Sequence, residues 1–489
     1  MSILAIVTDN SLEENKLEIQ NQQDIRLKNK IRRRKKNKLL ISKEIKRKKV
    51  QRKIIKRRAK KHRSKKRTQY IERKEQSLKS FHKFIEKSKF NANYNFDKKV
   101  RMTRKGQIIV EIPSSFSLIN NPDECIEVYK KIYQYGMSSS NRGLYFDHSQ
   151  CKDLELGASA VMDVLAINVK NYHKRMKRRF NFSGELPDDQ NIKMKLYVSG
   201  LLKHLGINNL LEQKIKEENK NLQLLELVRG GHHSTTMLVK RSNNSGTATT
   251  EVINYFDRCV RTQGFELSLK GKNYFGRLIG EVINNCEQHS GDFCQWFALG
   301  HYDVNEDGYG ECSLVLFNFG KSIYENMKSS TIAPDIKNAL DRLTKIHKSK
   351  WFRIKKEWDE EVLWTLYALQ EGVSRLRSTQ QKDRGVGTIK LIESFQTIGC
   401  TVGGKTPEMS IISGNAFILF NNEYELGEVD VDGHKLRRIA FNESNDLEQP
   451  PNPRNVKKLK NFFPGTIVTM KLFLDKTYLK YGIDKVESS

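Results

Sequence analysis

The sequence of 489 residues contains no long apolar run and no closely paired cysteines. A membrane-spanning helix needs about 18 or more consecutive apolar residues, and no stretch of the chain reaches that length. The apolar segment 1–7 has no basic residues before it and is too short for a secretory signal. The seven cysteines are scattered, odd in number and without a Cys-x-x-Cys pair. These absences argue against a membrane span, a disulfide framework and a zinc framework, and they predict a cytoplasmic protein with reduced thiols.

Residues 24–75 contain neither proline nor glycine. Within them, residues 26–67 hold 25 Lys and Arg against one acidic residue, Glu44, which gives this segment +24 of the chain's net charge of +31. Such a segment repels itself, and alone in water it is expected to be disordered or a frayed helix. The basic character therefore belongs to an N-terminal arm, residues 1–95, and not to the folded body.

The arm is predicted to bind DNA or RNA through residues 26–67, because phosphate groups would relieve its self-repulsion. No aromatic residue precedes Tyr70, which favours contacts with the phosphate backbone over base stacking. An acidic protein surface and a tail without a partner are the alternatives. We expect no membrane partner, because the arm lacks the Trp, Phe and Leu face of an interfacial helix.

The middle region, residues 96–230, has a mixed α/β pattern. Alternating or continuous apolar residues predict strands at 106–113 and 143–147, and helical spacing predicts helices at 123–135, 158–169 and 191–205. Strands that alternate with helices imply a layered α/β fold. A short strand that ends at Asp147 and precedes a helix rich in small residues resembles a STAS-like domain. That resemblance implies a regulatory serine before the helix, with Ser149 and Ser159 as candidates, although a structural scaffold is the simpler interpretation.

The C-terminal region, residues 231–480, opens with a helix pattern around residues 273–290, and a tail follows at 481–489. Glu281 and Asn285 are four residues apart, so they share one face of this helix. A carboxylate there can polarise an attacking water, while an amide oxygen can complete a Mg²⁺ shell made mostly of phosphates and waters. Without further context such a pair is usually only a solvated helix surface.

Three further motifs follow in order, and with the helix they resemble the four boxes of the GHKL ATPases, particularly the anti-sigma-factor kinase branch. Residues 281–289 read Glu-x-x-x-Asn-Cys-x-x-His, residues 312–317 form a strand pattern that leads into Asn-Phe-Gly-Lys-Ser at 318–322, residues 383–388 read Asp-Arg-Gly-Val-Gly-Thr, and Gly465-Thr466 lies within a strand pattern at 463–473. The resemblance implies an α+β protein, in which a GHKL-type α/β sandwich follows a STAS-like domain and the basic arm.

The same resemblance implies ATP and Mg²⁺ as cofactors. It implies Glu281 as the catalytic residue and Asn285 as the metal ligand. The nucleotide-binding residues would be Asn318, Gly320, Ser322, Arg384, Gly385, Gly387, Thr388 and Thr466. Asn318 stands where the family has Asp, and Ser322 stands where it has a second Gly. These two departures put adenine selectivity and turnover in doubt, because an Asn must also find an acceptor for its own NH₂ group.

The segment 329–384 is longer than a minimal ATP lid, and its Trp351, Trp358 and Trp364 are expected to be packing residues of an added helical lid. Residues 399–406 match the Gly-x-x-x-x-Gly-Lys-Thr pattern of a P-loop. A working P-loop follows a strand and opens a helix. Here a helix pattern precedes the glycines and a strand pattern at 409–413 follows, so we interpret the segment as a turn. His232-His233 is interpreted as a linker, since no other ligand pattern accompanies it.

The leading hypothesis is therefore a cytoplasmic, Mg²⁺-dependent ATPase with a regulatory α/β domain, a nucleic-acid-binding arm and an unidentified protein partner. One alternative is a serine/threonine kinase of the anti-sigma type. The other is a nucleic-acid-binding scaffold whose GHKL-type domain senses nucleotide without hydrolysing it.

Overall fold

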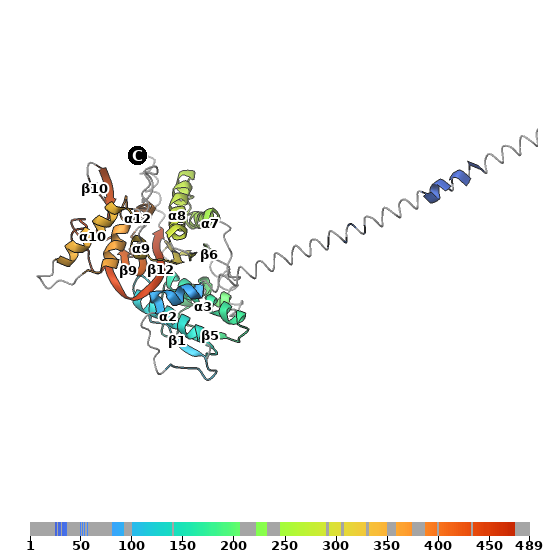
Figure 1. The fold of residues 1–489 in the computed structure, drawn as a ribbon, viewed down its shortest axis with the longest axis horizontal. Coiled ribbons are helices and arrows are strands. Elements are labelled where there is room, and N and C mark those ends of the chain that lie inside the picture. The colour runs from blue at the N-terminus through green and yellow to red at the C-terminus, as the bar shows by residue number, and fades with distance from the viewer. Residues whose placement is uncertain are drawn as a thin grey trace, which may run out of the picture. The chain divides into compact units, whose positions relative to one another are not determined.

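The computed structural model of the chain describes residues 81–91, 100–138, 141–205, 222–231, 245–289, 293–304, 308–328, 332–349, 358–373, 387–398, 401–431 and 434–474, and in the arm residues 25, 26, 28–30, 32–36, 49, 51, 53 and 56. The chain divides into two units, residues 1–73 and 74–489. In the first unit, every described residue is helical and exposed. The second unit is a mixed α+β structure, which confirms the predicted class (Figure 1).

The middle region is built on a three-stranded parallel sheet in the order β1–β3–β5. Its strands are β1 (Ile108–Glu111), β3 (Gly143–Asp147) and β5 (Asn181–Glu185). Helices α2 (Pro122–Met137) and α3 (Leu156–Arg175) connect them, and the short strands β2 (Ser115–Phe116) and β4 (Asp153–Leu154) pair alongside. Helix α3 is apolar around most of its circumference and is buried over most of its length, as expected for a helix covered on several sides.

The helix predicted at 191–205 is two helices in the structure. Helix α4 (Gln190–Val198) and helix α5 (Leu201–Leu205) are separated by Ser199 and Gly200. Gly200 has φ +89°, a left-handed conformation that other residues adopt only with strain. The chain changes direction at this break. The continuous helical spacing of the sequence therefore predicted one helix where the structure has two.

A five-stranded antiparallel sheet organises the rest of the body in the order β6–β7–β8–β12–β9. Its strands are β6 (Gln223–Gly230), β7 (Gln295–Val304), β8 (Gly310–Phe319), β12 (Val456–Leu474) and β9 (Glu408–Phe420). Strand β6 pairs with β7, although it lies within the middle region that we assigned to residues 96–230. The boundary at residue 230 is therefore moved to before Gln223, because a strand belongs with its pairing partner.

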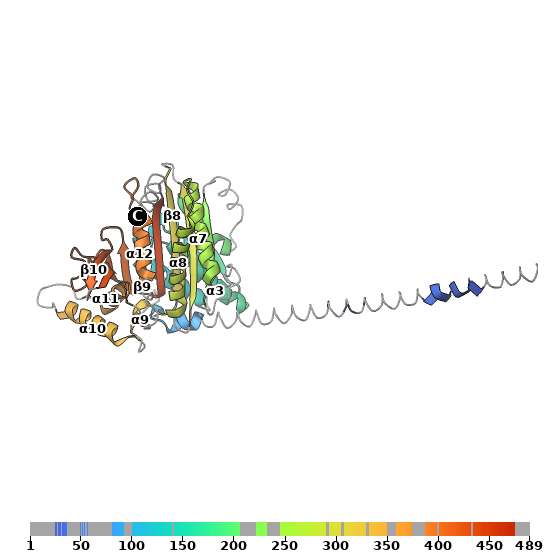
Figure 2. The same cartoon turned by 90° about the horizontal axis from the view of Figure 1, so that it is seen from above.

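Different helices cover the two faces of this sheet (Figure 1). Helices α7 (Ser245–Thr262), α8 (Leu269–His289) and α12 (Gly387–Ile398) share one apolar core with Leu314, Leu316 and other residues of one face. Val315 and Phe317 point to the opposite face, where they share a core with α2 and α3. We call these the α8–α12 face and the α2–α3 face. The axes of α7, α8 and α12 run along the strands (Figure 2).

The last residues assigned to the arm belong to the folded body. Residues 81–87 are helical, the 3₁₀ turn η1 (Lys89–Asn91) follows, and the side chain of Phe81 is 0% exposed. Phe81 contacts Tyr133 of α2 and Phe319 of β8, with ring centroids 6.4 and 5.2 Å apart. The arm therefore ends before Phe81, and not at residue 95.

The region between β8 and β9 contains helices α9 (Ile323–Met327), α10 (Pro334–Ser349) and α11 (Glu360–Ala368). Trp364 is buried in a small core with α9 and α10 and donates to Thr344 Oγ1 at 2.9 Å. Trp358 packs against the same core, whereas Trp351 lies outside the described residues. The hairpin of β10 (Gly427–Val431) and β11 (His434–Arg438) follows β9. Among the described residues, no helix combines the length and the apolar character needed to cross a membrane.

Candidate functional site

The sheet brings two of the predicted nucleotide-binding residues side by side. Asn318 of β8 and Thr466 of β12 are direct partners in the antiparallel register, and Thr466 in turn pairs with Ser413 of β9. All three alternate in phase with the residues of the α8–α12 face, so their side chains form a polar row across three strands. The Oγ atom of Ser413 lies 2.8 Å from Thr466 Oγ1. Ser413 could not be predicted from the sequence, because nothing near a serine in a strand reveals which strand it will pair with.

The position of the polar row depends on a close approach between the backbones of β8 and β12. Gly465 has φ +150°, and a Cβ atom built on it would lie 1.9 Å from the carbonyl oxygen of Asn318. Only glycine lets β12 approach β8 this closely beside Thr466. The Gly-Thr pair that we singled out in the sequence therefore has a structural role in placing Thr466 next to Asn318.

Helix α8 passes over Asn318. Cys286, which directly follows Asn285, donates from its Sγ to Asn318 Oδ1 at 3.6 Å. Burial raises the pKa of the Cys286 thiol, so the thiol remains a protonated donor. Asn318 is 3% exposed, so this contact is buried on the Asn318 side. The helix that carries Glu281 and Asn285 is thereby held against the strand that carries Asn318.

The metal-ligand candidate Asn285 and the catalytic candidate Glu281 differ in what the structure describes. Asn285 is half-buried, whereas its neighbour Asn284, about 100° further around the helix, is exposed. Glu281 belongs to α8, but its side chain lies outside the described part of the chain. A single amide oxygen suits Mg²⁺, which usually takes only one or two protein ligands beside phosphates and water. Across the described residues, no group of three or more His, Cys, Asp and Glu could hold a metal ion without such help.

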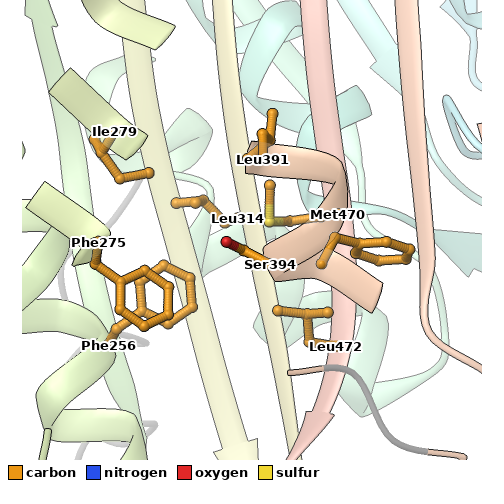
Figure 3. Close-up of a pocket in the computed structure, with 9 residues that line it drawn as sticks. Phe256, Phe275, Ile279, Leu314, Leu391, Ser394, Met470 and Leu472 are labelled. Atoms are coloured by element: carbon orange, nitrogen blue, oxygen red, sulfur yellow. The ribbon is translucent and has the colours of Figure 1, made fainter. Parts of the chain in front are cut away.

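Helix α12 begins at the end of the sheet where the polar row lies. A small apolar pocket lies between α8 and α12 over β8 and β12, and its lining includes Phe275, Ile279, Leu314, Leu391, Ser394, Met470 and Leu472. Figure 3 shows Ile279, Leu391 and Met470 displaced in one direction from Phe275, Ser394 and Leu472. In that direction, α8 continues along the chain toward Asn285. Helix α12 and strand β12 run the opposite way, so their earlier residues, the first turn of α12 and Thr466, lie in the same direction.

The first turn of α12 therefore points toward the polar row. Gly387 is its first residue, and Thr388 is half-buried. The first N–H groups of a helix have no partners within the helix, and this end is a favourable place for phosphate. Arg384 and Gly385, the other candidates of this motif, lie outside the described residues.

The motif at 318–322 is divided between two roles. The backbone N–H of Gly320 donates to Pro464 O at 3.2 Å. This bond joins the end of β8 to the start of the part of β12 that pairs with β8. Ser322 instead forms a capping box with Glu325 at the start of α9, and its side chain is fully buried. This differs from the predicted nucleotide contact, because a hydroxyl used in a cap is turned toward its own helix.

The P-loop pattern occupies a turn. Val402 and Lys405 form an antiparallel bridge, and Gly403 and Gly404 between them have positive φ angles of 57° and 75°. Helix α12 precedes this turn and strand β9 follows it, which is the reverse of the order that a P-loop requires. Residues 399 and 400 of the pattern, like His232 and His233, lie outside the described residues.

The two serines of the STAS-like region differ in accessibility. Ser149 is exposed and donates to Asp147 Oδ1 at 2.7 Å. Ser159 is fully buried in α3 and donates to Ser199 Oγ at 2.8 Å. Only Ser149 is accessible to a modifying group without unfolding.

Comparison of the chain with protein-family models, with curated proteins and with solved structures finds no match.

Proposed function

We propose that the α8–α12 face binds Mg²⁺-ATP in the manner of a GHKL ATPase, and that the basic arm binds nucleic acid. The observation that carries the first part is the convergence of separate motifs. Asn318, Thr466 and the Asn285–Cys286 step of α8 come from three distant segments, yet they meet at one end of one sheet face. The first turn of α12 points to the same end. This meeting supports a shared ligand, because packing alone does not require four motifs in one place.

In this proposal the polar row receives the adenine, and the start of α12, with Arg384, Gly385 and Gly387, receives the phosphates. Asn318 and Thr466 offer amide and hydroxyl groups that can pair with the ring's edge. Asn285 would hold the Mg²⁺ ion, which neutralises phosphate charge and orients the terminal phosphate when bound. Glu281 lies one turn before Asn285 on α8, and it would polarise the attacking water.

The test measures ATP binding and phosphate release for the full chain and three variants. Glu281→Ala should lower turnover by about 100-fold or more while ATP still binds. Asn285→Ala should weaken Mg²⁺-dependent binding. Asn284→Ala is the matched control, since it removes the same group from the exposed side of α8, and it should change neither quantity. An absence of ATP binding in wild type would overturn the proposal.

A non-hydrolysing nucleotide sensor is the second candidate, and the polar row itself favours it. Asn318 replaces a carboxylate, and Ser322 is committed to a helix cap. Both changes affect the adenine end of the family's motifs. This candidate predicts ATP binding without phosphate release, unchanged by Glu281→Ala. Turnover by wild type that Glu281→Ala abolishes would eliminate it.

A further inference from the structure

The three parallel strands of the middle region enter their sheet at one edge. Ile108 pairs with Leu144, and Gly143 pairs with Asn181, so the first residues of β1, β3 and β5 lie side by side. Because the strands are parallel, the segments that precede them meet at this edge. We call it the entry edge and define it by residues 101–107, 142 and 174–180.

Direct contacts join the three entering segments. The Nε2 atom of Gln107 donates to the carbonyl oxygens of both Leu144 and Asn181 at 3.3 Å. The backbone N–H of Asn181 donates to Arg142 O at 3.0 Å. A Cβ atom on Gly106 would lie 3.4 Å from Cδ of Arg142. The side chains that project from this edge therefore belong to one continuous surface.

That surface is basic. Seven of its residues are exposed cations, and none of them forms an ion pair with a described acidic residue: Arg104, Lys105, Arg142, Lys174, Lys177, Arg178 and Arg179. Arg101 is not among them, because it pairs with Glu111. Residues 81–489 carry 59 Lys and Arg against 49 Asp and Glu, and four of the seven cations come from the short segment 174–179. The parallel sheet adds Arg104, Lys105 and Arg142 to that segment.

The acidic residues of the same sheet lie at its opposite edge. Glu111, Asp147 and Glu185 occupy the last positions of β1, β3 and β5 and are in register. A strand of five residues separates the two edges by about 15 Å, which is more than a Debye length at physiological salt. Among the described residues, Glu111 pairs only with Arg101, in the segment that runs back along β1, and none of the three carboxylates forms an ion pair with the seven exposed cations.

Neighbouring groups respond to this excess of positive charge. Burial lowers the pKa of Lys170, and the nearby Lys174 lowers it further. Burial also lowers the pKa of His173, and Arg178 acts in the same direction. Burial is the larger cause in both cases, the neighbouring cations add to it, and Asp163 opposes part of the effect at Lys170.

Two exposed methionines lie among the cations. Met102 and Met176 are 54% and 48% exposed, which is unusual for large apolar side chains. Unbranched thioether side chains adapt to irregular surfaces. They offer apolar contact to sugars or bases beside phosphates that the cations would bind.

We propose that the entry edge is a second nucleic-acid-binding surface, which contacts the phosphate backbone independently of the arm and of any nucleotide site. Exposed arginines and lysines without acidic neighbours complement a continuous line of phosphates. An anionic membrane fits less well, because the edge presents no exposed Trp, Phe or Leu within its described residues.

The first test compares salt dependence in the full chain, with a labelled 20-base-pair DNA duplex as the probe. Arg104, Lys105, Arg178 and Arg179 are changed together to Gln. In the matched control, four exposed cations far from this edge in sequence, Lys321, Lys337, Lys345 and Arg454, are changed to Gln. The edge variant should bind at least about tenfold more weakly at low salt and show a shallower dependence of affinity on salt, by up to about 3.6 in log–log slope. Equal behaviour of the two variants would overturn the proposal.

The second test uses the wild-type chain, so it does not depend on any variant folding. Oxidation of individual methionines by dilute peroxide is followed by mass spectrometry, with the partly buried Met194 as an internal reference. Duplex DNA should slow the oxidation of Met102 and Met176 severalfold. Unchanged oxidation at saturating DNA would contradict the proposal, as would stronger protection by phosphatidylserine vesicles than by DNA.

Discussion

The two faces of the five-stranded sheet are packed in different ways. The α2–α3 face is rich in aromatic rings, including the stacked pair Phe297 and Phe317, and it shares one continuous core with the middle region. Polar bonds cross the same interface: Asn461 accepts from Lys130 Nζ at 2.9 Å and donates to Asp123. The α8–α12 face has fewer buried aromatic rings, a small pocket and the polar row.

The two faces therefore differ in how they are closed. A face that is closed by aromatic packing and by bonds between distant segments holds the strands in a fixed arrangement. The opposite face presents Asn318 and Thr466 beside a core of its own, which it shares with α7, α8 and α12. The following predictions are ordered by the size of the effect expected.

Gly465→Ala should be the most damaging change at the polar row. Its Cβ atom would collide with the backbone carbonyl of Asn318, which no side-chain movement can relieve. We expect a loss of about 3–4 kcal/mol in the free energy of unfolding. Gly264→Ala is the control, since Gly264 has φ +87° but open space around its Cα, and it should cost only about 1 kcal/mol. Urea denaturation measures both, and similar losses would refute the role of the close approach.

Glu155→Ala should have the largest effect on the α2–α3 face. The carboxylate of Glu155 accepts from Leu118 N at 2.5 Å and from the hydroxyl of Thr469, so it joins the middle region to β12. Its removal would leave buried donors without an acceptor, at a cost of about 2–3 kcal/mol. Glu155→Gln keeps an acceptor oxygen and should cost less. Equal destabilisation by the two variants, measured by thermal unfolding, would argue against this bond.

Two serines of β9 test the comparison on a single strand. Ser413 Oγ on the α8–α12 face accepts from Ile323 N at 2.8 Å and contacts Thr466, whereas Ser410 Oγ on the α2–α3 face donates to Leu118 O at 3.3 Å. Ser413→Ala should cost about 1–2 kcal/mol, and Ser410→Ala less than about 1 kcal/mol. In addition, only Ser413→Ala should weaken the binding of ATP. The reverse order of effects on ATP would move the site to the other face.

The smallest effects concern pH, and they have opposite signs. Burial raises the pKa of Glu155 above its ordinary value, so the cost of its charge is absent at low pH and appears as pH rises through the raised pKa. Arg437 bonds to Glu371 and lowers the pKa of that carboxyl, so its stabilisation is present above the ordinary pKa and is lost as pH falls through the lowered one.

Unfolding by urea between about pH 2.5 and pH 7 measures this contrast, because the loss at Glu371 falls below the ordinary glutamate pKa of about 4.3. As pH falls, wild type should gain stability relative to Glu155→Gln and lose stability relative to Glu371→Gln. Parallel pH profiles for the two comparisons would contradict the assigned directions.

The elements with strong periodicity could be predicted from the sequence. Helices α8 and α12 and strands β8, β9 and β12 lie where their patterns placed them, and β3 has the expected bounds. Pairing could not be predicted, because a strand's neighbour depends on residues far along the chain. That is why β6 was assigned to the wrong region and why Ser413 was missed.

Two other differences have local causes. Phe81, Ile85 and Phe90 occur among lysines, and only tertiary packing distinguishes them from the arm. The capping role of Ser322 could have been predicted from the sequence, since Ser-Ile-Tyr-Glu at 322–325 has the spacing of a capping box. The resemblance to a glycine motif drew attention away from that signal. The roles of Glu281, Arg384 and Gly385 stay predictions.

The anchoring of Phe81 also has a mechanical consequence. Phe81 is the first described residue of the body after the basic arm. Its ring packs edge-on against the ring of Phe319. Phe319 directly follows Asn318. A pull on the chain at Phe81 would therefore bear on a backbone position one residue from the polar row, through the face of the sheet that is packed with aromatic rings.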